Sequence, residues 1–222
     1  MPQRQEDTAD IMVECECHKK SKIMSLWEKS GISLENRDMV FENYNIHNEM
    51  AKLMKLKAIE YFKNFETIKK ERNNSLAFLG QPGAGKTHLT VAIATRFIDK
   101  GINVIYFQFR DAITKLKQNI TNENVYQNMM DKYKKIPVLL IDDLFKKGKR
   151  EEPVAGADIR AMFEIINYRY INHLPIIVSS ELSSDDLIEI DEALGSRIIQ
   201  MCKNYLVIVK GKDNNYRLKE VK

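Results

Sequence analysis

The stretch from Gly80 to His88 reads GQPGAGKTH and carries the spacing Gly80-x-x-x-x-Gly85-Lys86-Thr87. It follows a short apolar run, SLAFLG, and opens a segment with helical spacing of apolar residues. Glycines let backbone N–H groups turn toward phosphate oxygens, and the start of a helix adds positive potential. The stretch therefore predicts a nucleotide-phosphate loop between a strand and a helix.

Each position of this loop has an expected role. Lys86 is expected to reach the β- and γ-phosphates of ATP, and the Thr87 hydroxyl to bind Mg²⁺. The alternative is a glycine-rich turn of no special function, which the complete motif in its correct context disfavours. The residues expected to contact the nucleotide are Gly80, Gln81, Pro82, Gly83, Ala84, Gly85, Lys86, Thr87 and His88.

A second motif, VLLIDDL, places two acids at the end of an apolar strand. A carboxylate at the tip of a neighbouring strand can hold Mg²⁺ through water, which suits Asp142. Asp143 is expected to orient or deprotonate the attacking water. Many ATPases of this design have the longer Glu at the second position, so we expect slow hydrolysis. The alternative is a pair of acids that simply ends a strand at the surface.

Short apolar runs alternate with helical stretches from residue 75 onward. Because these runs do not alternate with polar residues, they predict an α/β fold with a parallel sheet covered on both faces. Before them, apolar residues at helical spacing predict a helix that buries Met50, Leu53, Met54, Ala58 and Phe62. The strands are expected at 75–80, 103–109, 137–144, 175–180 and 205–211, and helices at 86–101, 111–133, 157–173 and 183–203, the last broken near 190–191.

The composition is that of one α/β domain with a short extra segment. The chain has 222 residues, 44% of them hydrophobic, and a formal net charge of +4. No apolar run approaches the ~18 residues of a membrane helix, and the polar start MPQRQEDTAD lacks an apolar signal core. We therefore expect a cytoplasmic protein without membrane contact. Ile23, Leu26 and Trp27 predict a helix that stops at Gly31.

The cysteines do not form a metal pattern. Cys15, Cys17 and His18 lie in the run CECHKK, but zinc usually takes four ligands and this run offers at most three. An odd total of three cysteines also argues against a disulfide scaffold. We therefore do not expect zinc.

Basic residues near the predicted site have two open interpretations. Arg197 follows a Gly-Ser pair, and Arg217 follows the last predicted strand; taken alone, each is a surface arginine or a phosphate contact. The run FKKGKRE follows the acidic strand tip, where it fits either a solvated loop or a DNA-backbone contact. The candidate DNA-binding residues are Lys146, Lys147, Lys149 and Arg150.

Taken together, these motifs resemble the AAA+ ATPases of the DnaC/DnaI helicase-loader type, which are related to the IstB-type transposition ATPases. The similarity runs from about Cys15 to Arg217. It is carried by GISLENRDMVFENYN, GQPGAGKTHLTVAIA, LLIDDL, IINYRYINHLPIIVSS and EIDEALGSRIIQMC, in that order. The resemblance implies an AAA+ core with a five-stranded parallel sheet in the order 5-1-4-3-2.

The resemblance also implies roles for single residues. Arg197 would act as an arginine finger on a neighbouring subunit, and Arg217 would be a second phosphate sensor. Residues around Phe41 to Tyr44 would lie near the adenine. Where the family often has Asn as a sensor, this chain has Glu181, which would repel a phosphate. Either Ser180 takes over this role or the sensor is weakened.

The resemblance implies an ATP-dependent loader of the replicative helicase hexamer that binds ATP, Mg²⁺ and single-stranded DNA and self-associates through Arg197. Residues 1–40 would be the helicase-interaction segment and residues 41–222 the AAA+ ATPase domain. Two alternatives remain open. One is an IstB-like transposition helper that binds duplex DNA and a transposase. The other is an adaptor that binds ATP without hydrolysing it.

Overall fold

The computed structural model describes residues 15–146 and 153–218. Its centre is a parallel sheet of five strands in the order β2-β3-β4-β1-β5, which confirms the predicted order read from the opposite edge. All of the strand pairs are parallel. The strands are β1 (Leu76–Gly80), β2 (Val104–Gln108), β3 (Val138–Asp142), β4 (Ile176–Ser180) and β5 (Leu206–Val209).

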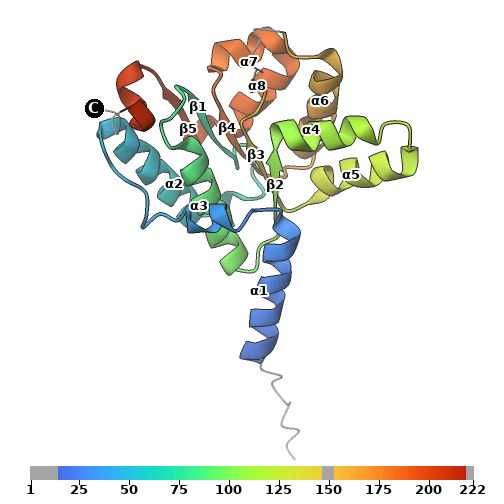
Figure 1. Cartoon of the computed structure of the whole chain (residues 1–222), viewed down its shortest axis with the longest axis horizontal. Coiled ribbons are helices and arrows are strands. Elements are labelled where there is room, and N and C mark those ends of the chain that lie inside the picture. The colour runs from blue at the N-terminus through green and yellow to red at the C-terminus, as the bar shows by residue number, and fades with distance from the viewer. Residues whose placement is uncertain (1–14, 147–152, 219–222) are drawn as a thin grey trace, which may run out of the picture.

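Helices cover both faces of this sheet, as Figure 1 shows. One layer of buried apolar residues joins the sheet to α1 (Glu16–Ser30), α2 (Glu49–Ile68) and α3 (Lys86–Asp99). The second layer joins its other face to the remaining helices. Because both faces are covered, the central strands are apolar throughout, as the sequence predicts. The helices of the second layer are α4 (Phe109–Gln118), α5 (Glu123–Lys135), α6 (Gly156–Ile171), α7 (Ser184–Ile190) and α8 (Glu192–Met201).

Two helical predictions need correction. The single helix predicted over 111–133 is two helices, α4 and α5, because the Asn122 side chain accepts a hydrogen bond from Val125 N (3.3 Å) and starts a new helix. The buried face of α2 is also rotated from the predicted one. Met54 and Ala58 are buried as predicted, but Leu53 is 43% exposed. The helix packs through Ala51, Met54, Ala58, Tyr61 and Phe65, a set with the 3–4 residue spacing of one face.

The break predicted near 190–191 is confirmed, since Asp191 separates α7 from α8 and its side chain accepts from Leu194 N (2.8 Å). The stop predicted at Gly31 is confirmed as well; Gly31 has a left-handed φ of 75° at the end of α1. Leu26 of α1 and Ile32 are buried in the same apolar layer as Phe41. The division of the chain at residues 40 and 41 remains a prediction.

Short 3₁₀ segments complete the described chain: η1 (Glu35–Asp38), η2 (Lys203–Tyr205), η3 (Lys212–Asn214) and η4 (Tyr216–Leu218). In Figure 1, α1 projects away from the sheet, whereas the C-terminal segment lies beside α2 and β5. Across residues 15–146 and 153–218, no helix is both long and apolar enough to cross a bilayer.

Candidate functional site

The phosphate loop lies where the sequence predicts it, between the end of β1 and the start of α3. Gly85 precedes α3 with a left-handed φ of 81°, and a Cβ added there would lie 2.7 Å from the Tyr44 ring. This position therefore requires glycine for two reasons, backbone conformation and close approach of an aromatic ring. The loop wraps the N-terminus of α3, whose first backbone N–H groups have no partners within the helix.

Lys86 is held inside this loop. Its Nζ donates hydrogen bonds to the backbone carbonyls of Gly80 and Gln81, both at 2.7 Å. Burial lowers the pKa of Lys86 to about 8, although the carboxylates of Glu181 and Asp143 act in the opposite direction. An anionic phosphate at this point would stabilise the charged form of the ammonium.

Asp142 is buried at the tip of β3 and is oriented by hydroxyl groups. Thr87 Oγ1 donates to Oδ1 of Asp142 at 2.9 Å, and Ser179 donates a short hydrogen bond to the same oxygen. Tyr106 on the neighbouring strand donates to Oδ2 at 2.8 Å. Hydroxyl and carboxylate oxygens are the ligands that Mg²⁺ prefers, so the donor set of Thr87 and Asp142 fits this ion.

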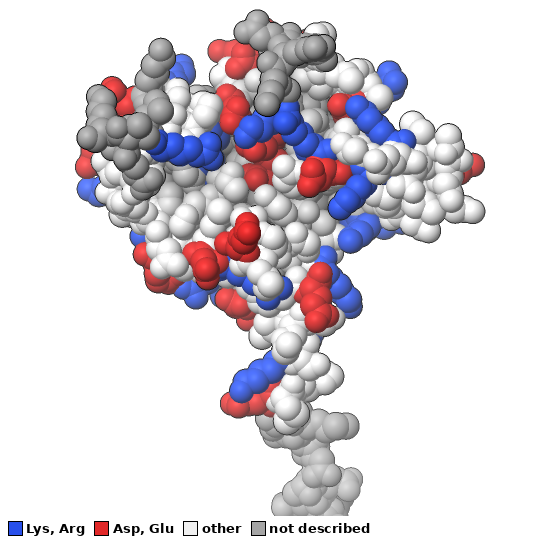
Figure 2. Space-filling view, in the orientation of Figure 1, with Lys and Arg blue, Asp and Glu red and all other residues white. Residues whose placement is uncertain are grey.

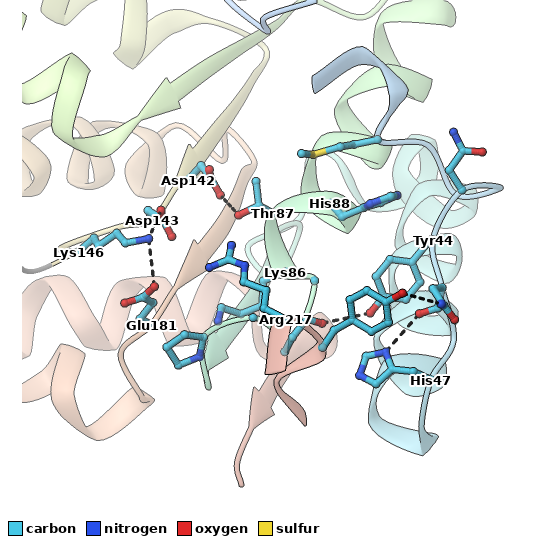
Figure 3. Close-up of a pocket in the computed structure, with 18 residues that line it drawn as sticks. Tyr44, His47, Lys86, Thr87, His88, Asp142, Asp143, Lys146, Glu181 and Arg217 are labelled. Carbon is cyan, nitrogen blue, oxygen red and sulfur yellow. Dashed lines mark hydrogen bonds and ion pairs between the residues drawn. The ribbon is translucent and has the colours of Figure 1, made fainter. Parts of the chain in front are cut away.

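Asp143 lies beside Asp142 but has a different partner. Its carboxylate Oδ2 is 2.8 Å from Lys146 Nζ, and the same ammonium lies 3.1 Å from Oε1 of Glu181 (Figure 3). Lys146 thus points into the cavity, and neither of the two interpretations left open by the sequence, a solvated loop or a DNA-backbone contact, included this position. Lys147, Lys149 and Arg150 lie outside the described residues.

Ser180 is placed differently from the other candidate residues. Its hydroxyl donates to Leu144 O (2.7 Å) and accepts from Leu182 N (3.1 Å), and its side chain is fully buried. It therefore connects β4 to the turn after β3 and does not line the cavity. Glu181, the next residue, lines it instead.

The C-terminal segment closes the other end of the site. Tyr216 N donates to Gly83 O at 3.0 Å, and Asn45 donates to the Tyr216 hydroxyl at 3.1 Å. The His47 ring lies against the Tyr216 ring, with 5.1 Å between centroids. Arg217, on the same segment, points toward Lys86 in Figure 3. These contacts join the segment before α2 and the phosphate loop to the C-terminal segment.

Together these elements enclose a cavity of about 460 Å³. Phosphate-loop, acidic and basic residues lie along one part, and aromatic and amide side chains from the segment before α2 lie along the other (Figure 3). A cavity with a cationic end and an aromatic end suits a nucleotide. Its lining residues are Met39, Asn43, Tyr44, Asn45, His47, Pro82, Gly83, Ala84, Gly85, Lys86, Thr87, His88, Asp142, Asp143, Lys146, Glu181, Tyr216 and Arg217.

Arg197 is not brought into this cavity. It lies on α8, where its guanidinium donates to Ala193 O (2.6 Å) and faces the rings of Phe163 and Tyr170. An arginine finger that acts on a neighbouring subunit need not contact its own site, so this role stays a prediction.

The cysteines lie away from this cavity. Cys15 and Cys17 are exposed at the start of α1, and Cys202 is buried.

Several lining or supporting residues were not singled out from the sequence. Tyr106, Ser179 and Tyr216 have no local motif, and their roles depend on contacts between distant segments. Tyr106 offers one weak signal, a phenol within the apolar run NVIYFQF of a strand next to the acidic strand. His88, which the sequence does single out, lines the cavity; its Nε2 donates to Val40 O (2.8 Å) and its ring packs edge-on against Tyr44.

Comparisons with known proteins identify relatives of this chain. The chain is 42% identical to the Bacillus subtilis protein YqaM over 201 residues, which cover 89% of this chain and 63% of YqaM. It is 36% identical to the phage-like element PBSX protein XkdC of Bacillus subtilis, covering 96% of this chain and 81% of XkdC. The chain thus spans less than two thirds of the length of YqaM.

A solved structure of a DnaC helicase loader has the same fold. It superposes with a TM-score of 0.68 at 28% identity, covering 80% of this chain and 100% of the solved one. The resemblance to AAA+ helicase loaders related to IstB is confirmed. The model of the IstB-like ATP-binding proteins matches residues 19–222, and the chain therefore belongs to that family.

Proposed function

We propose that this protein is an ATP-dependent loader of a replicative DNA helicase. One observation carries the nucleotide part: Lys86 and Thr87 at the start of α3 and Asp142 and Asp143 at the tip of β3 converge on one cavity. The similarity to a solved DnaC helicase loader supports the loader part. ATP binding would set the shape and assembly of the subunits, and hydrolysis would time their release from the helicase.

Each residue would contribute a distinct step. Lys86 would bind the β- and γ-phosphates, and Arg217 would approach the same end from the C-terminal segment. Thr87 and Asp142 would hold Mg²⁺, whose positive charge would offset the negative charge of the phosphates. Asp143 would accept a proton from water as its oxygen attacks the γ-phosphorus and the bond to the β–γ bridging oxygen breaks. Arg197 of a neighbouring subunit would stabilise the charge that develops.

The helicase contact is proposed for the N-terminal segment. Met24 is 65% exposed on α1, and Leu34 is 74% exposed just before η1. Exposed apolar side chains on a projecting helix suit docking to a partner's apolar groove (Figure 1). Single-stranded DNA is proposed as a second partner because the resemblance to helicase loaders of the DnaC/DnaI type implies it. In Figure 2, positive and negative side chains are intermixed over the visible face, so charge on that face does not mark a DNA groove.

The test is to mix the chain with the host's replicative helicase and ATP and to measure the mass of the complex in solution. A stable complex with the helicase hexamer is expected, and it should weaken when Met24→Glu and Leu34→Glu are combined. Ile120→Glu is the matched control. Ile120 is 60% exposed and lies between α4 and α5, two helices that cover the other face of the sheet. No complex, with ATP binding intact, would contradict the loader function.

A transposition helper is the second candidate, because the matching family model is that of IstB-like proteins. Binding to duplex DNA and a transposase, without helicase binding, would support it.

A non-hydrolysing adaptor is the third candidate, since Lys146 holds the Asp143 carboxylate in an ion pair. Phosphate release measured with and without single-stranded DNA separates the adaptor from a protein that hydrolyses ATP. No release under either condition would favour the adaptor.

A further inference from the structure

Three charged side chains meet at the phosphate end of the cavity. Lys146 Nζ lies between the carboxylates of Asp143 (2.8 Å) and Glu181 (3.1 Å), as Figure 3 shows. The two acids follow the ends of the adjacent strands β3 and β4. The acidic residues Asp142, Asp143 and Glu181 line the same cavity as the basic residues Lys86, Lys146 and Arg217, so each ammonium that is held by a carboxylate is partly neutralised until a phosphate takes its place.

The turn that carries Lys146 is tightly built. Asp143 and Phe145 both have left-handed backbone angles, with φ of 56° and 54°, which are costly for residues other than glycine. Leu144 N donates to Ser179 O (2.9 Å), and the Ser180 hydroxyl donates to Leu144 O (2.7 Å). Strained conformations of this kind are kept at functional sites, where they aim a side chain.

Buried side chains hold the same turn from below. Leu144 and Phe145 are both buried, and the Phe145 ring packs edge-on against Phe109 with centroids 5.3 Å apart. Lys146 N donates back to Asp143 O at 2.9 Å, which closes the turn. The backbone of Lys146 is therefore fixed, while its long side chain can rotate between partners within reach.

We propose that Lys146 is a second lysine for the γ-phosphate of ATP, held by Asp143 and Glu181 before nucleotide binds and transferred to the γ-phosphate when ATP binds. Glu181 is then a positioning residue for Lys146. This inference rests on the proposed function, namely that the cavity binds ATP. It explains why a carboxylate occupies the strand end at which a neutral sensor was expected.

The charge state supports this exchange. Burial acts to lower the pKa of Lys146, but the hydrogen bonds and charges of Asp143 and Glu181 outweigh it and raise that pKa. The ammonium is therefore charged at neutral pH. When it moves to a phosphate, the Asp143 carboxylate loses its ion pair and becomes free to accept a proton from water. ADP has no γ-phosphate, so Lys146 would stay paired with Asp143 when ADP binds. The Asp143 carboxylate would therefore lose its ion pair, and could act as the base, when ATP binds but not when ADP binds.

The test is a comparison of ATP and ADP affinity in Lys146→Met, measured by titration calorimetry with Mg²⁺. We expect ATP affinity to fall about 10- to 100-fold, the size of one lost charge-assisted hydrogen bond, and ADP affinity to stay within about threefold. Lys146→Arg should keep most of the discrimination. Lys135→Met is the matched control, because Lys135 forms a similar ion pair with Asp131 (2.7 Å) on α5, away from the cavity.

A double-mutant cycle tests the role of Glu181. Glu181→Gln alone should leave ATP favoured over ADP. In Lys146→Met the Glu181 carboxylate has no ammonium to position and only repels phosphate, so Glu181→Gln should then raise ATP affinity, and the two changes should be non-additive. Additive effects of the two changes would overturn the positioning role. An equal loss of ATP and ADP affinity in a folded Lys146→Met, or no loss of either, would overturn the inference while the proposed function stands. A wild-type chain that binds neither nucleotide would overturn both.

Discussion

The Thr87 hydroxyl lies 2.9 Å from Oδ1 of Asp142, which joins the start of α3 to the tip of β3 across 55 positions of sequence. The carboxylate also accepts from Tyr106 and Ser179, so its orientation is set before any metal arrives. Two oxygen-bearing side chains are thus held in place on two rigid elements, which suits the proposed role of Thr87 and Asp142 as Mg²⁺ ligands.

Asp142→Asn should remove most of the effect of Mg²⁺ on nucleotide binding. The amide keeps the size of the side chain but not its charge, so we expect the gain in ATP affinity on adding Mg²⁺ to shrink about 10-fold or more. Binding of a fluorescent ATP analogue with Mg²⁺ and with EDTA measures this gain. Asp131→Asn on α5, a half-exposed acid paired with Lys135, should behave like the wild type. An unchanged Mg²⁺ effect would contradict the metal assignment.

Lys86→Ala should abolish useful nucleotide binding. The substitution removes the buried ammonium that lies against the carbonyls of Gly80 and Gln81. Loss of a charge-assisted contact of roughly 3 kcal/mol lowers affinity about 100-fold. Equilibrium titration with ATP and a thermal melt, to check folding, measure this change. Tight ATP binding by the folded variant would overturn the phosphate-loop assignment.

Gly85→Ala and Gly101→Ala form a matched pair. Both glycines have left-handed backbone, with φ of 81° and 77°, so alanine costs about 1–2 kcal/mol at either position. A Cβ at Gly85 also meets the Tyr44 ring at 2.7 Å, whereas nothing lies within 4 Å of a Cβ at Gly101. We expect both variants to lose thermal stability and Gly85→Ala alone to lose ATP affinity. Equal ATP affinity in the two variants would show that the Tyr44–Gly85 contact does not shape the site.

Arg169→Met should destabilise the fold without touching the nucleotide site. Arg169 is fully buried, and burial lowers its pKa to about 9. Its guanidinium donates to backbone carbonyls that include those of Ile136 (2.8 Å) and Pro175 (2.7 Å), which precede β3 and β4. Leaving buried carbonyls unpaired costs about 3 kcal/mol or more.

Denaturant unfolding measures this loss of free energy. Arg160→Met is the control, since Arg160 is exposed on the same helix, α6, and should change stability by less than about 0.5 kcal/mol. A similar midpoint for the two variants would show that the buried guanidinium does not hold the strand starts together.

Arg197→Ala should keep ATP binding and lose turnover in assemblies. The expected role is in trans, because Arg197 is absent from the cavity lining and faces Phe163 and Tyr170. Mixing tests this directly. Lys86→Ala has no working nucleotide site but keeps its arginine, so adding it to Arg197→Ala should restore part of the turnover. Phosphate release that does not recover on mixing would contradict a finger acting between subunits.

Local sequence was sufficient for most of the fold. The strands were predictable because each is a short apolar run, and burial on both faces requires such runs. The phosphate loop was predictable because its glycines, Lys86 and Thr87 meet a requirement of backbone geometry and charge within eight positions. Gly31 and Asp191 likewise end or start helices through their own conformation or side chain.

Pairings between distant segments were not predictable from one sequence. The rotated face of α2 depends on which side of the helix meets α3 and the sheet, and an apolar Leu53 was therefore misplaced. Ser180 facing the phosphate was one of two alternatives for the sensor, but its hydroxyl is used by the backbone at Leu144 and Leu182. Such choices follow from the packing of whole elements, which a local pattern does not contain.

By itself, the sequence determined the strand–loop–helix that binds phosphate, the acidic strand tip and the order of elements along the chain. These features depend on neighbouring residues, whose backbone and side-chain preferences act over a few positions. The tertiary structure alone decided that Lys146 pairs with Asp143 and Glu181, that Tyr106 orients Asp142, and that Tyr216 closes the cavity. Apart from the pair of Lys146 with Asp143, which is three positions away on the same turn, those contacts join segments far apart in sequence, and their distances are set by how the helices and strands pack.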